Sequence, residues 1–126
     1  MGKNVETEEI IEKPYTLRKL KDGDLFPVLQ IFKKIGMKEF KGAFTKVADG
    51  KPIEEIGLLV LMDIAIVVID NADKAEAEIY SLWADIAGIT VDELKDMEFG
   101  TLPLMIMDSF GEVKNTAFFK VLSKLL

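Results

Sequence analysis

Residues Ile53–Asp70 (IEEIGLLVLMDIAIVVID) decide which class of fold the chain can adopt. The β-branched run at residues 64–69 would suit a buried strand, but the stretch is far longer than the typical strand of about five or six residues. Its length therefore favours a helix. Within it, Asp63 and Asp70 are seven positions apart, so we expect them to form a thin polar strip on an otherwise buried helix.

Two amphipathic helices are predicted before this stretch. The first begins after Asp24, which is a plausible N-cap, and Gly36 supplies its C-terminal stop. The second follows with little gap and also has one apolar face. The apolar residues of the first are Val28, Ile31, Phe32 and Ile35, and those of the second are Met37, Phe40, Phe44 and Val47.

Capping signals mark two helices after the central stretch. Asp73 and Glu76 have the spacing of a capping box, and Gly88 ends the helix that follows. Its apolar stripe consists of Ala75, Ile79, Leu82, Trp83 and Ile86. Thr90 and Glu93 repeat the capping-box spacing and predict a short helix that ends near residue 97.

The last part of the sequence predicts two more helices. One begins at Thr101 or a neighbour, carries Pro103 in its first turn and ends at Gly111. Its apolar residues are Leu102, Met105, Ile106 and Phe110. The final helix is capped by Asn115 or Thr116, and its apolar face consists of Phe118, Val121, Leu122 and Leu125.

These elements predict an all-α fold, a compact domain of about six or seven helices with a short extended N-terminal arm. Residues 1–14 are expected to form a flexible arm, because they are polar and Pro14 breaks any helix there. Residues 15–18 alternate like a short strand or an extended segment. Residues 15–126 form the single helical domain, because no repeat or interdomain linker interrupts them.

Composition removes several kinds of chemistry. The chain of 126 residues contains no cysteine and no histidine, which excludes disulfides, Cys/His zinc sites, and catalysis through a thiol or an imidazole. We therefore expect a protein that is not an enzyme and needs no cofactor. The N-terminus has no apolar signal segment, and the apolar run at residues 56–69 is shorter than the roughly twenty residues that span a bilayer, so we expect a cytoplasmic protein without a membrane contact.

The net charge of −6 is unevenly distributed. Residues 24–51 carry six lysines against three acids, whereas residues 52–100 carry twelve acids against two lysines. The acidic centre would repel nucleic acid and favour solubility, and it could attract a basic partner or the lysine-rich segment of another copy. A solvated acidic face is the simplest interpretation of this pattern.

Three features of the sequence are weaker signals for chemistry. Asp63 could be a general acid or base in an apolar environment, but it has no histidine or nucleophile to work with, and it can equally face solvent. The acids at residues 70–78 lack the turn glycine of a calcium loop. The helices around Gly36 suggest a helix-turn-helix, but Arg18 is the only arginine and lies outside the second helix, so no nucleic-acid partner is expected.

The final helix offers the best candidate for a partner-binding surface. Its apolar stripe would satisfy packing within the domain, but Phe119 and Leu126 point to an adjacent face. Docking on the domain itself and docking on a partner helix are therefore equally supported. The candidate partner-binding residues are Phe118, Phe119, Leu122, Leu125 and Leu126.

Three stretches of the sequence resemble one family. Residues 15–36 (YTLRKLKDGDLFPVLQIFKKIG) resemble the opening of tail assembly chaperones from phages and prophages of Gram-positive bacteria. Residues 79–97 (IYSLWADIAGITVDELKDM) are similar to the middle of these proteins, where a helix ends in glycine and a Thr-capped acidic turn follows. Residues 117–126 (AFFKVLSKLL) resemble their double-phenylalanine C-terminal helix.

The resemblance implies a non-enzymatic role in virion morphogenesis. Such chaperones bind the long, helix-rich tape measure protein and keep it soluble until tail tube subunits polymerise around it. It also implies self-association, a location in the host cytoplasm but not in the mature virion, and in many members a longer product made by ribosomal frameshifting. The alternative function is a small helical adaptor, or a dimer like a transcription regulator, that binds protein or nucleic acid.

Overall fold

The computed structural model describes residues 14–43 and 53–113 of the chain. Within these two ranges the chain is helical, without a strand, so the predicted all-α class is confirmed. The α-helices are α2 (Leu25–Ile35), α4 (Ile53–Asp70), α5 (Glu76–Ala87), α6 (Val91–Lys95) and α7 (Thr101–Gly111). Three 3₁₀ turns connect them: η1 (Asp22–Asp24), η2 (Met37–Phe40) and η3 (Ala72–Ala75).

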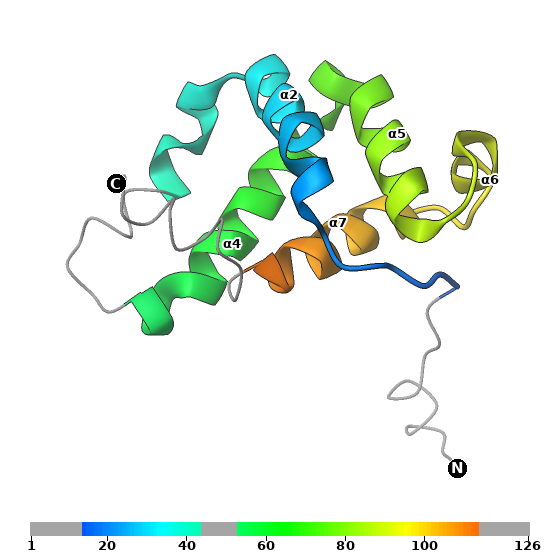
Figure 1. Cartoon of the computed structure of the whole chain (residues 1–126). Helices are drawn as coiled ribbons and strands as arrows, with labels where there is room; N and C mark the ends of the chain where they lie inside the picture. Colours follow the sequence, from blue (N-terminus) through cyan, green and yellow to red (C-terminus); the bar gives the residue numbers. More distant parts are fainter. Residues whose placement is uncertain (1–13, 44–52, 114–126) are drawn as a thin grey trace, which may run out of the picture.

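The helices pack as two neighbouring pairs. Helix α4 lies mainly against α7, and α2 lies against α5 and η3 (Figure 1). Residues 14–20 run as an extended segment past the end of α5, where the N–H of Arg18 donates to the carbonyl of Ile86 at 3.0 Å. This segment, called the arm below, has the extended conformation that the sequence predicts for residues 15–18, and it forms no strand.

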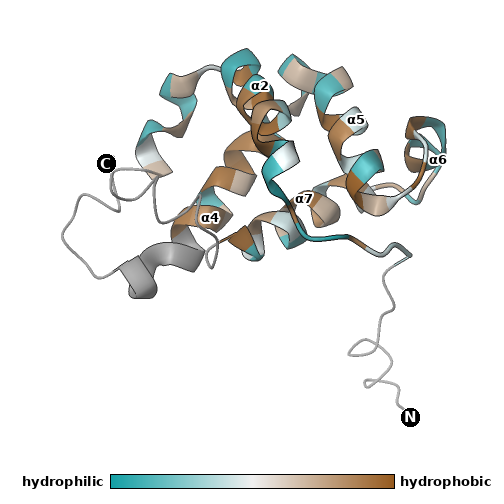
Figure 2. Ribbon diagram, in the orientation of Figure 1, coloured by the Kyte–Doolittle hydropathy of each residue, from teal (hydrophilic) through white to brown (hydrophobic). Residues whose placement is uncertain are grey.

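The central helix forms as its length predicts, over Ile53–Asp70. Figure 2 shows hydrophobic residues along most of its described length. On the outer side, Asp70 is exposed and Asp63 half-buried, as expected for a polar strip, but Ile66 lies between them with 53% of its surface exposed. Among the described residues, no helix is long and apolar enough to cross a membrane.

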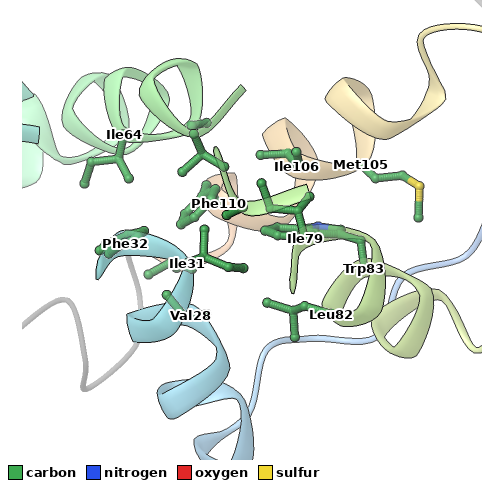
Figure 3. Packing of buried hydrophobic residues seen from close by; sticks show 14 of the residues in the cluster. Val28, Ile31, Phe32, Ile64, Ile79, Leu82, Trp83, Met105, Ile106 and Phe110 are labelled. Atoms are coloured by element: carbon green, nitrogen blue, oxygen red, sulfur yellow. The ribbon is translucent and has the colours of Figure 1, made fainter. Parts of the chain in front are cut away.

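The core is assembled from the apolar stripes that the sequence predicts. All four predicted residues of α2 are buried, and so are the five of the stripe that ends at Gly88. Figure 3 shows side chains of α2, α4, α5 and α7 converging in one cluster. The rings of Phe32 and Phe40 stack with centroids 4.4 Å apart, and the ring of Trp83 lies 6.1 Å from that of Phe110.

The helix ends agree with the sequence in some places and differ in others. Gly36 and Gly88 have φ values of +107° and +72°, a conformation that favours glycine and ends α2 and α5 as predicted. The side chain of Thr90 accepts from the N–H of Glu93 at 3.0 Å, and the Glu93 carboxylate accepts from the N–H of Thr90 at 2.8 Å. This capping box is confirmed, although α6 ends at Lys95.

The predicted capping box at Asp73 and Glu76 is wrong. Asp73 lies inside the 3₁₀ turn η3, and α5 begins only at Glu76, with no side-chain hydrogen bond to its first turn. The turn places Ala75 in the core with 1% of its surface exposed, so tertiary packing fixes this helix start. Met37 also differs from the prediction, because the turn that follows Gly36 leaves 52% of its surface exposed.

Candidate partner-binding groove

Helices α2 and α5 run in opposite directions and are joined at both ends by ion pairs. Arg18 connects Asp24, at the start of α2, with Asp85, near the end of α5. At the other end of the pair, the ammonium of Lys34 lies 2.6 Å from a carboxylate oxygen of Glu78. This contact holds the pKa of Glu78 below its usual value. The ion pairs therefore bridge the two helices near both of their ends.

Arg18 makes the more extensive of the two connections. Its Nη1 and Nη2 donate to the two carboxylate oxygens of Asp24 at 2.8 and 3.0 Å, and Nη2 also donates to Asp85 at 2.6 Å. The backbone N–H of Lys21 donates to the same Asp24 carboxylate at 2.9 Å. The guanidinium hydrogen bond is the main reason that the pKa of Asp24 is lowered, and the same bond raises the pKa of Arg18.

This arrangement corrects the role that the sequence suggests for Asp24. The residue occupies the N-cap position of α2, but its side chain makes no capping hydrogen bond. Its carboxylate turns instead toward the arm and binds Arg18, where only 7% of the side chain remains exposed. The guanidinium offers the carboxylate two parallel hydrogen bonds and an opposite full charge, whereas a capping bond offers one neutral backbone N–H, so the tertiary partner takes precedence over the local one.

A groove with a volume of about 730 Å³ lies between these helices. Leu82, which is buried, and Ala77 contribute apolar surface from α5, and Pro27 contributes it from α2. Phe26 lines the groove with 75% of its surface exposed. The polar lining comes from Lys21, Asp24, Gln30, Glu78, Ser81 and Asp85.

The chemistry of the groove suits binding of apolar side chains. Three of its carboxylates, those of Asp24, Glu78 and Asp85, are already engaged with Arg18 or Lys34. An exposed phenylalanine beside small apolar residues can cover an apolar side chain of another protein. In the described part of the chain, no group of three or more acidic side chains is placed to hold a metal ion.

A second, smaller hollow of about 360 Å³ lies between the arm and α7. There the hydroxyl of Tyr15 donates to a carboxylate oxygen of Asp108 at 2.7 Å. Burial is the main cause that raises the pKa of Tyr15, and the hydrogen bond to Asp108 adds to it. The neighbouring Ser109 accepts a hydrogen bond from the indole N–H of Trp83 at 2.9 Å. This hollow therefore lies where the arm contacts the helical domain.

Most of the candidate site residues that the sequence singles out lie beyond the described part of the chain. Phe118, Phe119, Leu122, Leu125 and Leu126 lie outside the described residues, and so does the predicted helix that contains them. Asp63 is half-buried on the outer side of α4, away from the groove lining. Of these candidates, Asp63 is the one within the described residues, and it does not line the groove.

Sequence reasoning missed the groove residues Phe26 and Asp85, and it missed that Arg18 binds two carboxylates of the groove lining. One signal was available, because Arg18 is the only arginine of a chain with fifteen lysines. A planar guanidinium is suited to binding two carboxylates at once. No signal in the sequence identifies Asp85 as its partner, because the two residues meet only when α5 packs on α2.

Comparisons of the chain with protein-family models, with curated proteins and with solved structures found no match.

Proposed function

We propose that the chain is a non-enzymatic phage tail assembly chaperone that binds the tape measure protein and keeps it soluble during tail morphogenesis. The resemblance in residues 15–36, 79–97 and 117–126 supports this function. The tail tube protein is a possible second partner. The chaperone would act in the cytoplasm of the bacterial host, would self-associate, and would be absent from the mature virion.

The groove between α2 and α5 is the observation that carries the proposal. Residues 15–36 contain the arm and α2, and residues 79–97 contain most of α5 together with α6. Two of the three resembling stretches therefore meet in space and form one apolar groove with the exposed Phe26 on its lining. A long helical protein that exposes apolar stripes before assembly would place side chains in such a groove.

The charge of the chain fits the same role. Twelve of its 22 acidic residues lie in residues 52–100, which contain only two lysines. A complex with one acidic surface remains soluble while its apolar surface is covered, because like charges keep the complexes apart.

Co-expression with the tape measure protein tests the function. The tape measure protein is the product of the very long helix-coding gene expected downstream, and we expect it to be soluble and to co-elute with the chain on gel filtration. If its solubility is unchanged by the chain and no complex elutes, the proposed function is wrong. The small helical adaptor or regulator then becomes the better reading.

A matched pair of variants tests the groove. Phe26→Asp should weaken the complex by about tenfold or more, because burying a phenylalanine contributes about 1.5–3 kcal/mol. Phe99→Asp is the control, because Phe99 is fully exposed and is not part of the groove lining. Equal loss of binding in the two variants would show that binding depends on general hydrophobicity and not on the groove.

Phe119 provides a separate test of the C-terminal segment. We expect Phe119→Asp to weaken partner binding and to leave the fold intact, because the sequence places Phe119 beside the apolar stripe and not in it. Loss of cooperative thermal unfolding in this variant would instead assign Phe119 to the core.

A further inference from the structure

The outer face of α4, defined by Met62, Asp63, Ile66 and Asp70, combines two apolar side chains with the two aspartates of the polar strip. These residues follow one another at helical spacing, so they lie along one side of the helix. Ile66 has 53% of its surface exposed, while Met62 is half-buried. A helix that is apolar on nearly every side normally lies within a protein, with its outer side covered as well.

The chain leaves α7 beside this face. A Cβ atom added to Gly111, the last residue of α7, would lie 3.7 Å from the terminal methyl group of Met62. Two residues later, Val113 is buried with 5% of its surface exposed. The described chain therefore ends, at Val113, two residues after its approach to the Met62 end of the outer face.

The sequence of residues 114–126 (KNTAFFKVLSKLL) complements this face. It has an apolar stripe at helical spacing, formed by Phe118, Val121, Leu122 and Leu125. It also has three lysines and no acidic residue, whereas the polar residues of the outer face are two aspartates. Thirteen residues span about 20 Å as a helix, and the outer face is about 12 Å long from Met62 to Asp70.

We infer that residues 114–126 dock on the outer face of α4 in the same chain, with their apolar stripe over Met62 and Ile66. The lysines of the segment then lie near Asp63 and Asp70, where opposite charges favour the docked position. Phe119 lies beside the stripe and remains available to another protein. This inference concerns the domain itself and does not depend on the identity of the partner.

Disulfide trapping in the full-length protein tests the inference, because the chain contains no cysteine of its own. Ile66→Cys is combined in turn with Phe118→Cys, Leu122→Cys and Leu125→Cys, so that one pair can meet the short Cα separation of a disulfide. The control series combines Phe99→Cys with the same three substitutions. Phe99 is fully exposed, which makes its replacement at least as accessible to oxidation.

We expect at least one Ile66→Cys pair to form a disulfide within the monomer, about tenfold faster than its Phe99→Cys control, because docking raises the effective concentration of the thiols. Equal rates in the two series would overturn the inference. Disulfide-linked dimers as the main product would also overturn it, because the segment would then dock on a second copy.

A single-cysteine measurement covers the case in which the double variants do not fold. In the full-length chain, the Ile66→Cys thiol should react with a maleimide several-fold faster when Leu122→Asp and Leu125→Asp are added. The Phe99→Cys thiol should show no change with the same two substitutions. An unchanged rate at Ile66→Cys would mean that residues 114–126 do not cover α4.

Discussion

The guanidinium of Arg18 binds two carboxylates that belong to different helices, Asp24 at 2.8 and 3.0 Å and Asp85 at 2.6 Å. The two contacts differ in environment, because the Asp24 side chain is 7% exposed and the Asp85 side chain is 70% exposed. An exposed ion pair contributes little to stability, whereas removal of one partner from a buried pair is costly. The contact between Arg18 and Asp24 is therefore the one that stabilises the attachment of the arm.

Replacing Asp24 should destabilise the protein and reduce its sensitivity to acid. We expect Asp24→Asn to lower the free energy of unfolding by about 1.5–3 kcal/mol at pH 7, the usual range for a hydrogen bond to a charged group. The folded-state pKa of Asp24 lies below its ordinary value of 3.8, so its stabilisation is present above that value and is lost as the pH falls through the folded-state pKa. Urea unfolding at several pH values measures both effects.

The matched control for this prediction is Asp85→Asn, which removes the exposed partner of the same guanidinium. It should change the free energy of unfolding by about 0–1 kcal/mol. A loss at Asp85→Asn as large as that at Asp24→Asn would contradict the assignment of the main contact.

The raised pKa of Tyr15 predicts a loss of stability in alkali, as the lowered pKa of Asp24 predicts one in acid. Tyr15→Phe removes the hydrogen bond to the Asp108 carboxylate and should cost about 1.5–3 kcal/mol at pH 7, the usual range for a hydrogen bond to a charged group. The pKa of Tyr15 is raised above its ordinary value of 10.0, so its contribution is complete below pH 10 and is lost as the pH rises through the folded-state pKa. The difference in unfolding free energy between the wild type and Tyr15→Phe should therefore shrink above pH 10. A difference that stays constant to higher pH would argue against this contact.

The buried hydrogen bond between Trp83 and Ser109 predicts a loss of stability without a change of fold. Ser109→Ala leaves the indole N–H unpaired in the core and should cost about 1–3 kcal/mol. Trp83 is the only tryptophan, so its fluorescence reports directly on this position during unfolding. Ser81→Ala, at an exposed serine of α5, is the control and should stay within about 0.5 kcal/mol of the wild type.

Two glycines that both have room for a Cβ atom, but have different backbone conformations, provide the last prediction. Gly36 has a φ of +107°, and Gly36→Ala should cost about 1–3 kcal/mol even though the nearest atom to an added Cβ is 4.0 Å away. Gly42 has open space around its Cβ position and an ordinary backbone, so Gly42→Ala should be neutral or stabilising by up to about 1 kcal/mol. Thermal unfolding of both variants separates backbone strain from steric contact. Similar losses in the two variants would disprove strain at Gly36.

Local patterns in the sequence determined most of the described helices. Residues Ile53–Asp70 form a helix because an apolar run of that length cannot be a single strand in a small domain. Gly36 and Gly88 end helices because the backbone there adopts a positive φ, which glycine tolerates since it has no Cβ. The capping box of Thr90 and Glu93 formed because both of its partners lie within one turn.

Only the tertiary structure decided how the polar residues are used. Asp24 and Asp73 have the same local signal for an N-cap, but Asp24 binds Arg18, and Asp73 lies in a turn whose position follows from the burial of Ala75. The groove and its exposed Phe26 likewise exist only because α2 packs on α5. The position of a residue in the helical repeat determines which side of its own helix it occupies. Its long-range partner depends on how the helices pack, and that packing depends on the whole chain.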